Sequence, residues 1–441
     1  MNDERVVEEI VTTFLLNSCK LRPQLSEHIA DAAIHCALTA YFSPSFADDA
    51  YGDMAMIPLT TGSVAEFYIE PMLPHIGDID VMYYQSNELA IPRGHLPPTQ
   101  LPAEFHNFVD VYEIDDSGFS GYVYLRLCYL LTECFHDGKY NAANYKGYLM
   151  GIPKSSLMHG PAWVCTTIGH SLLCDNVFCL RCLVWPPQAA DWPRRHRNYS
   201  WPDSATVDHV VNNGCDVVRM AHRQCRQDEW MNKAQWRISF SRAEIVLINS
   251  WMPLQQIVYH LLRVFMKTER LTDSANNTVT GSLSNYHIKT LMLWASELKS
   301  RTWWTGDLNL VRICVQLLHS LGDWLTDARC QHYFINNCNL IDNSVNVTNI
   351  GGQLMSIDAT WLSMWFVDNY IRQCSKLCAD NISRLFDDVS TTIKLQKAVN
   401  AIVVWRLNST LLDLRHALNW TEYYIKQYVY KVSLTARSCS C

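Results

Sequence analysis

The sequence of 441 residues predicts an α+β protein with two lobes, a mixed β-sheet lobe followed by an all-helical lobe. From residue 62 to 235, short runs of β-branched and aromatic residues alternate with turn and proline-rich segments. From residue 242 onward, apolar residues recur almost throughout at helical spacing. Apolar residues make up 49% of the chain and charged residues 18%. This composition excludes a mainly disordered protein.

The order of the elements follows from these patterns. Residues 1–50 are expected to form N-terminal helices, with a loop over 43–60 where Ser-Pro and Gly-Asp pairs occur. Residues 51–235 are expected to form the sheet-containing core, 236–350 the helical lobe and 351–441 a C-terminal helical extension. The clearest predicted strands are 79–84, 107–114, 121–131 and 176–185, and the clearest predicted helices are 242–267, 284–298 and 308–326, with two or three more within 357–433.

Charge is distributed unevenly along the chain. The net charge is −7, yet residues 1–150 hold 7 Lys and Arg against 21 Asp and Glu. This asymmetry is consistent with metal binding in the first part and an anionic ligand in the second, or with two solvated faces of different composition. No apolar stretch approaches the ~18 residues that span a bilayer. With an odd 17 cysteines and no secretory-signal pattern, we expect reduced thiols and a cytoplasmic or nuclear protein.

The first chemical motif combines Gly62-Ser63 with the acidic pair Asp78 and Asp80. In a strand, residues i and i+2 share one face, so the two carboxylates are expected side by side. A divalent cation relieves their repulsion, and hard oxygen ligands suit Mg²⁺ or Mn²⁺. A Gly-Ser pair entering a helix can bind phosphate, so the pattern indicates a site for a nucleoside triphosphate and its metals.

A two-metal phosphoryl-transfer site normally needs a third carboxylate on a neighbouring strand, and Asp175, at the start of an apolar run, could be that residue. An Asp-Asn pair is also common in turns, so a strand-entry role for Asp175 remains an alternative.

Two further motifs place polar groups near a cleft between the lobes. Alternation puts Arg237, Ser239 and Ser241 on one strand face, and Ser241 is expected to cap the next helix in a capping box with Glu244. Lys289 lies in the first turns of a helix, against the dipole preference, which indicates an anionic partner. That partner could be a phosphate, Glu297 or another carboxylate.

The order of these motifs resembles the male-abnormal-21 superfamily, which includes cyclic GMP-AMP synthase and related receptors. The segments that carry the resemblance lie within roughly residues 60–345 and are GS and DID, a later strand Asp, WPPQAADW, WRISFS, SNYHIKT and HYFI. The resemblance implies a bilobed nucleotidyltransferase fold, an enzyme that uses ATP and/or GTP with Mg²⁺ or Mn²⁺, and a role in innate immunity. It implies that Gly62 and Ser63 bind triphosphate, that Asp78, Asp80 and Asp175 are catalytic metal ligands, and that Arg237, Ser239, Ser241 and Lys289 bind nucleotide.

The chain also departs from the pattern of cyclic GMP-AMP synthase, which carries a His-and-Cys zinc insertion after the helix that follows the WRISFS-like segment. Residues 242–290 contain no Cys and only His260 and His287, so no Cys-rich zinc site is expected there. Cys179 and Cys182, like Cys374 and Cys378, are interpreted as core thiols. The resemblance implies an aromatic side chain in the helix 308–326 on which a nucleotide base stacks. The plausible positions are His319 and Ser320, and neither carries Tyr, Trp or Phe.

The activating ligand implied by the resemblance is anionic, such as double-stranded RNA. Its candidate contacts, which a merely solvated basic loop would also explain, are Arg194, Arg195, Arg197, Arg219, Arg223 and Arg226. A non-catalytic scaffold that keeps the fold is the alternative to an enzyme.

Overall fold

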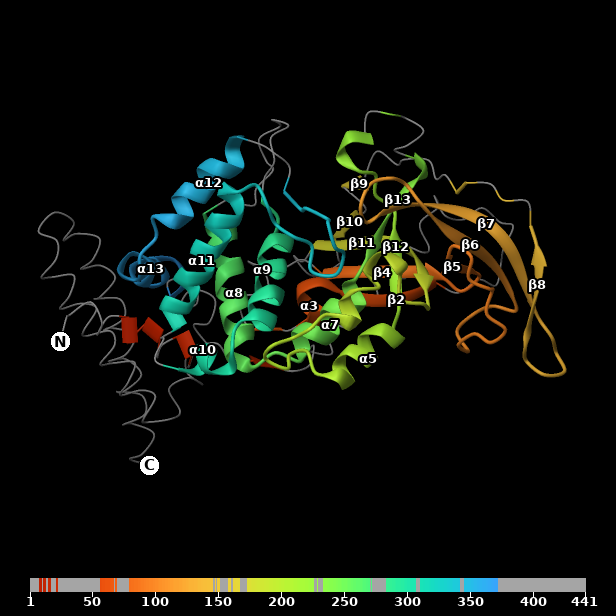
Figure 1. Cartoon of the computed structure of the whole chain (residues 1–441), viewed down its shortest axis with the longest axis horizontal. Coiled ribbons are helices and arrows are strands. Elements are labelled where there is room, and N and C mark those ends of the chain that lie inside the picture. Colours follow the sequence, from red (N-terminus) through yellow and green to blue (C-terminus); the bar gives the residue numbers. More distant parts are fainter. Residues whose placement is uncertain are drawn as a thin grey trace, which may run out of the picture.

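A mixed β-sheet and a group of helices lie side by side in the computed structural model (Figure 1). The structure describes residues 56–66, 68–69, 79–145, 147, 149–150, 158–159, 162–166, 173–225, 228, 233–269, 271, 283–306, 310–341 and 345–371, with the pairs 8–9, 11–12, 15–16 and 21–22. The two-lobed α+β fold expected from the sequence is confirmed, whereas the predicted extension after residue 371 lies outside the described residues.

Within the described chain, eleven strands form one sheet and a second sheet has two strands. The strands are β1 (Leu21–Arg22), β2 (Met56–Thr61), β3 (Tyr68–Ile69), β4 (Ile79–Gln85), β5 (Glu88–Pro92), β6 (Phe108–Asp116), β7 (Tyr122–Glu133), β8 (Tyr140–Asn144), β9 (Met158–His159), β10 (Ala162–Thr166), β11 (Leu173–Cys182), β12 (Cys215–Val218) and β13 (Gln235–Ser239). β1 pairs with β3 outside the large sheet.

Strand β11 joins the two parts of the large sheet. It pairs in parallel with β4 through its first half and with β5 through its last residues. β4 also pairs with β2, and β5 pairs with β6, which continues into the antiparallel β7–β8 arm at the edge of Figure 1. β12 and β13 close the sheet by linking β11 to β7. The four predicted strands correspond to β4, β6, β7 and β11.

The α-helices of the described chain gather mainly on one side of the sheet. They are α3 (Gly62–Glu66), α5 (Ser204–Asn212), α7 (Ser241–Asn249), α8 (Pro253–Thr268), α9 (Asn285–Leu298), α10 (Arg301–Thr305), α11 (Leu310–Thr326), α12 (Val345–Met355) and α13 (Ala359–Trp365). α3 and α7 lie between the sheet and helices α8, α9, α11, α12 and α13, whereas α5 lies beside the strands (Figure 1).

The single helix expected over 242–267 is wrong, because the chain turns at 250–252 and forms α7 and α8 instead. Pro253 occupies the first turn of α8, where its missing N–H costs nothing and its fixed φ favours a new start. The predicted helices 284–298 and 308–326 correspond to α9 and α11.

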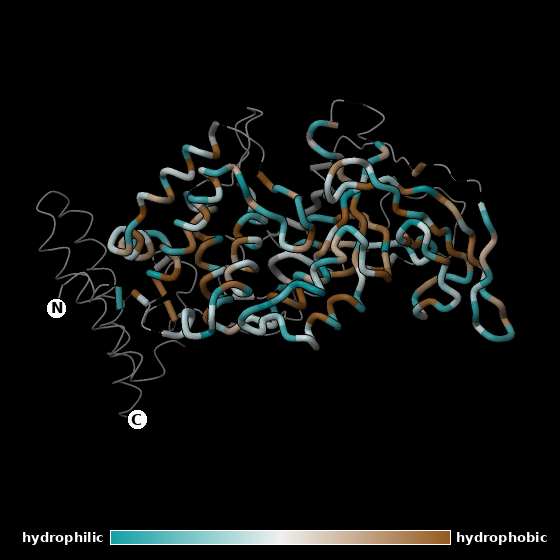
Figure 2. Tube along the Cα trace, in the orientation of Figure 1, coloured by the Kyte–Doolittle hydropathy of each residue, from teal (hydrophilic) through white to brown (hydrophobic). Residues whose placement is uncertain are grey.

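One apolar core runs through both lobes. Leu180 and Trp236 of the sheet belong to the same buried cluster as Leu261 and Leu318 of the helices. Figure 2 shows hydrophobic segments along both the strands and the helices where they face one another. Fully burying a large apolar side chain contributes about 1.5–3 kcal/mol, so this shared core fixes the lobes against each other. None of the described helices is long and apolar enough to cross a membrane.

Candidate active site

Two of the three predicted catalytic carboxylates are neighbours on adjacent strands. Asp80 of β4 and Asp175 of β11 are partners in the parallel register, and both side chains are half-buried. Neighbouring strands lie about 4.8 Å apart, so in-register side chains share one face at short range. Asp78 lies outside the described residues. The structure therefore brings together Asp80 and Asp175, which are far apart in the chain.

Gly62 lies against Asp80 of this acidic pair, directly after the end of β2. That strand ends at Thr61, the register partner of Asp80, and Gly62 then takes a φ of +64° to begin α3. A Cβ on Gly62 would overlap Asp80 Oδ2, so only glycine leaves room for the carboxylate. Ser63 follows within α3, in agreement with the expected turn into a helix.

The donor set fits a hard divalent cation. Two carboxylates on one face repel each other, and a divalent cation relieves that repulsion. Within the described ranges, which exclude Asp78, no group of three or more His, Cys, Asp and Glu side chains could hold a metal ion. Asp80 and Asp175 would be two ligands of such an ion, with Asp78 as the predicted third.

The polar face of the WRISFS segment is arranged as expected. Trp236, Ile238 and Phe240 are buried, whereas the alternate side chains are half-buried at Arg237, Ser239 and Ser241. The Oγ atoms of Ser239 and Ser241 lie 3.1 Å apart. Arg237 sits in β13 between Val218 and Tyr122.

The capping box predicted for Ser241 and Glu244 is wrong. The N-cap position of α7 is Phe240, and Ser241 is already the first helical residue. Its backbone N–H donates to Ser239 Oγ at 3.4 Å, and Glu244 reaches Lys289 instead of the helix start.

Lys289 has two carboxylate partners from this chain. Its Nζ forms ion pairs with Glu66 of α3 and with Glu244 Oε2 of α7, the latter at 2.8 Å. Burial alone would lower the pKa of Lys289, but Glu244 and Glu66 raise it well above its usual value. Of the partners considered from the sequence, a carboxylate is the one found here, although not Glu297. The predicted contact of Lys289 with nucleotide stays a prediction.

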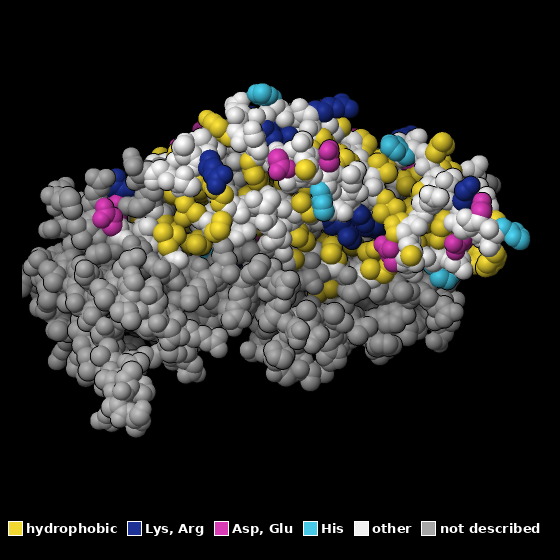
Figure 3. Space-filling view, turned by 90° about the horizontal axis from the view of Figure 1, so that it is seen from below, with side chains coloured by type: hydrophobic (Ala, Val, Ile, Leu, Met, Phe, Trp, Pro, Cys, Tyr) yellow, Lys and Arg dark blue, Asp and Glu magenta, His cyan; other side chains and the backbone are white. Residues whose placement is uncertain are grey.

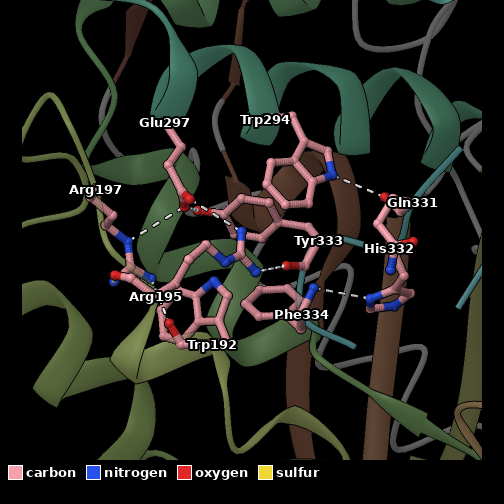
Figure 4. Close-up of polar contacts among 9 residues, drawn as sticks. All are labelled: Trp192, Arg195, Arg197, Trp294, Glu297, Gln331, His332, Tyr333 and Phe334. Carbon is pink, nitrogen blue, oxygen red and sulfur yellow. Dashed lines mark hydrogen bonds and ion pairs between the residues drawn. The ribbon is translucent and has the colours of Figure 1, made fainter. Parts of the chain in front are cut away.

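Glu297 instead binds two arginines of the loop that follows β11 (Figure 4). Arg195 Nη1 lies 3.2 Å from Glu297 Oε1, and Arg197 Nε lies 3.4 Å from Oε2. Tyr333 Oη donates to the same carboxylate at 2.7 Å, and Arg195 Nη2 donates to the Tyr333 carbonyl. We call these four residues, with Trp192 and Trp294, the arginine cluster.

Aromatic rings enclose the charges of the arginine cluster. The Arg195 guanidinium lies 4.4 Å from the Trp294 ring centre and 5.0 Å from that of Tyr333, and Arg197 lies 4.9 Å from the Trp192 ring centre. Cation–π contacts strengthen when water is excluded. The Glu297 side chain, which both arginines meet, is only 2% exposed. The loop 185–204 is thus anchored to α9 and to the HYFI segment.

The expected basic surface is therefore largely wrong for this loop. Arg195 and Arg197 are turned into the arginine cluster, and Arg219 is buried. Arg194 is exposed, whereas the side chains of Arg223 and Arg226 lie outside the description. On the face seen in Figure 3, Lys and Arg side chains stand in separate groups among apolar and acidic ones.

His332 of the HYFI segment is held as a neutral ring. Its Nδ1 accepts the backbone N–H groups of Phe334 at 3.0 Å and Ile335 at 3.1 Å, and its Nε2 lies 3.1 Å from Tyr286 Oη. Burial lowers the pKa of His332 to about 4. His332 thus orders a tight turn against α9.

The interpretation of Cys179 and Cys182 as core thiols agrees with their complete burial as free cysteines, whereas Cys374 and Cys378 lie outside the described residues. His287, one of the two histidines considered for zinc, caps α9 with Ser284. His260 is buried in α8.

The two positions of α11 considered for base stacking, His319 and Ser320, both bond to backbone carbonyls. His319 Nε2 bonds the Ile357 carbonyl at 2.7 Å. Ser320 Oγ donates to the Gln316 carbonyl.

Sequence reasoning missed Glu66 and predicted a capping role for Glu244, whereas Glu297 was one of several possible partners of Lys289 and binds Arg195 and Arg197 instead. No local pattern marks Glu66, because its partners Lys289 and Tyr259 come from distant helices. All three glutamates are buried beside basic side chains, and this pairing becomes visible only once the fold is known.

The sequence of this chain is similar to that of a known protein family. Family models match residues 159–250 as the Mab-21 protein nucleotidyltransferase domain and residues 255–351 as the Mab-21 protein HhH/H2TH-like domain. The curated proteins named male abnormal 21 from Caenorhabditis briggsae and Caenorhabditis elegans are each 24% identical over 164 residues. These matches cover 36% of this chain and 42% of each relative, so they span less than half of the relatives' length. The match to the nucleotidyltransferase domain model contains Asp175 but begins after Gly62 and Asp80.

Proposed function

The chain is a member of the Mab-21 superfamily with a nucleotidyltransferase fold, and from that premise we propose that it is a metal-dependent nucleotidyltransferase. Its substrates would be ATP and/or GTP, and its product a cyclic dinucleotide or oligonucleotide. The observation that carries the proposal is the register pairing of Asp80 with Asp175 beside Gly62. A scaffold has no need for two carboxylates on one face with a glycine shaped to admit one of them.

The proposed roles follow from the positions of the side chains. Asp80 and Asp175, with Asp78, would hold Mg²⁺ or Mn²⁺, which when bound polarises the α-phosphate and favours ionisation of the attacking hydroxyl. Gly62 and Ser63 would bind the donor triphosphate at the start of α3. The half-buried Arg237, Ser239 and Ser241 would face the acceptor nucleotide.

An anionic activator such as double-stranded RNA belongs to the same proposal and rests on the family resemblance. Of the six arginines predicted to contact it, Arg194 is the one whose described side chain is exposed. Phosphate contacts position a nucleic acid but carry little sequence information, so such an activator would be recognised by shape and charge.

The alternative is a non-catalytic member that keeps the fold. It is favoured by the two candidate stacking positions of helix α11. His319 and Ser320 bond to the Ile357 and Gln316 carbonyls, and neither side chain has a ring as large as that of Tyr or Trp on which a base could stack.

The deciding experiment incubates the protein with labelled ATP and GTP, Mg²⁺ or Mn²⁺, and a panel of nucleic acids. We expect Asp78→Asn with Asp80→Asn, and Asp175→Asn separately, to reduce product by more than about a hundredfold, because even indirect support of a metal is worth about 10–100-fold. The variants should stay folded, since carboxylate repulsion is relieved.

Asp323→Asn, on the exposed side of α11, is the control for these variants. Unchanged product in the acidic variants would remove the two-metal assignment. No product from the wild type under any condition would favour the scaffold.

A further inference from the structure

Four charged side chains are buried together where α3 meets the helical lobe. They come from four different helices, α3, α7, α8 and α9. Glu66 is 1% exposed, Glu244 3% and Arg263 7%, and the Lys289 side chain is 13% exposed. Charges are almost never fully buried unless they are paired, so such a group has to be explained by its contacts.

Lys289 binds both carboxylates, as described above. Tyr259 Oη donates to the second oxygen of Glu66 at 3.3 Å, so both oxygens of Glu66 are used. Arg263 lies against the Tyr259 ring, 5.4 Å from its centre. Burial raises the pKa of Glu66, while Lys289 and Arg263 oppose that shift. Two acidic and two basic groups make the set neutral, and we call it the junction cluster.

Among the described side chains, Glu66 of the junction cluster makes most of the polar contacts that tie α3 to other helices. This helix has five residues, too few to be stable without tertiary contacts. Its other described polar anchor is the Ala65 carbonyl, which accepts from Asn249 Nδ2 of α7 at 3.2 Å. At its opposite end, Gly62 contacts the carboxylate of Asp80. The position of Gly62-Ser63 relative to Asp80 is therefore tied to whatever holds Glu66.

We propose that Glu66 is a positioning residue of the candidate site, through which α7, α8 and α9 hold α3 against Asp80. This inference rests on the proposed function, because the position of α3 matters for triphosphate binding at Ser63. Lys289, Glu244 and Arg263 act through Glu66 and are not required to touch a substrate for this role. The helical lobe is thereby coupled to the acidic pair of the sheet by a largely buried salt bridge.

The test compares Glu66→Gln with Glu297→Gln, because both replace a buried glutamate that binds a basic side chain. Hydrogen exchange of the segment 56–66 is measured in the full chain. We expect Glu66→Gln to speed exchange in α3 by at least about tenfold and Glu297→Gln to leave α3 unchanged, since exchange reports local opening. Equal protection of α3 in the wild type and in Glu66→Gln overturns the proposal, whether or not the protein makes a nucleotide product.

A second pair of variants separates positioning from folding. Lys289→Met leaves an excess buried negative charge and should lower the unfolding temperature, whereas Glu66→Gln with Lys289→Met restores neutrality and should recover most of it. The double variant should still show fast exchange in α3. Restored protection of α3 in the double variant contradicts positioning by Glu66.

Kinetics provide the last readout if the wild type makes product. Glu66→Gln should then raise KM for nucleotide more than it lowers kcat, and Glu66→Asp should restore part of the loss. An unchanged KM in Glu66→Gln contradicts positioning by Glu66, while an inactive wild type contradicts the proposed function alone.

Discussion

The acidic pair and the arginine cluster are both groups of charged side chains set among hydrophobic residues, and the fold arranges them in opposite ways. Asp80 and Asp175 stay half-buried on one face of β4 and β11, where two like charges meet. Arg195 and Arg197 turn inward and meet the same carboxylate, Glu297, among aromatic rings. Opposite charges that close on each other stabilise a junction, whereas like charges held side by side favour the binding of a cation.

The largest effect is expected from the arginine cluster. Arg195→Ala should reduce the free energy of unfolding by about 3–5 kcal/mol, because it leaves Glu297 buried with a partner missing. Urea unfolding of the variant and the wild type measures the difference. A loss below about 1 kcal/mol would place the cluster with ordinary surface ion pairs and remove the contrast with the acidic pair.

The next largest effect is a loss of folding stability at low pH, caused by protonation of His332. Its pKa is 6.5 in the unfolded chain and about 4 in the folded state, so the folded state binds fewer protons in that window. Stability therefore falls as the pH falls through that window, by about 3 kcal/mol for this group. Protonation of Nδ1 also removes its bonds to the Phe334 and Ile335 N–H groups.

The check is unfolding measured at pH 7 and pH 4.5 for the wild type and His332→Asn. The variant should lose less stability on acidification, because Asn can accept the same N–H groups without titrating. The stability of the variant should still fall somewhat with pH, because burial also lowers the pKa of His260. Parallel acid profiles for the two proteins would show that His332 does not set the acid sensitivity.

A smaller effect is expected at the glycine beside the acidic pair. Gly62→Ala should cost about 1–2 kcal/mol for its left-handed backbone, and its Cβ would also displace the Asp80 carboxylate. Gly118→Ala is the matched control, because Gly118 has a φ of +78° with no atom near its Cβ position. Both variants should lose this backbone contribution, Gly62→Ala should lose further stability because Asp80 has to move, and Mn²⁺ affinity should fall only in Gly62→Ala. Equal metal affinity in the two variants would separate Gly62 from the site.

The smallest effect on stability is expected at Arg194, the exposed neighbour of the arginine cluster. Arg194→Glu should change the free energy of unfolding by less than about 0.5 kcal/mol. If the chain binds duplex nucleic acid through this residue, the slope of log affinity against log salt should fall by about one. Superimposable salt curves would exclude Arg194 from an activator surface.

The fold was largely predictable because its strands and helices are marked by local periodicity. β4, β6, β7 and α9 lie within two residues of their predicted ends. The sequence also predicted that Asp175 would lie on a strand next to that of Asp80, although it did not predict their exact register. The partners of Arg195 and Lys289 were not predictable, because a basic residue in a sequence looks the same whether it faces solvent or a glutamate that is distant in the chain.

The register of β4 against β11 also has a consequence for how the chain folds. Tyr83 and Cys179, which contact each other in this pair of strands, are 96 positions apart. Non-local parallel pairing is slow, because the entropy of closing a long loop is lost before any contact compensates for it. The helices can form from local contacts while the two aspartates are still far apart. In pulse-labelling experiments, amides of α8 and α11 should therefore become protected before those of β4.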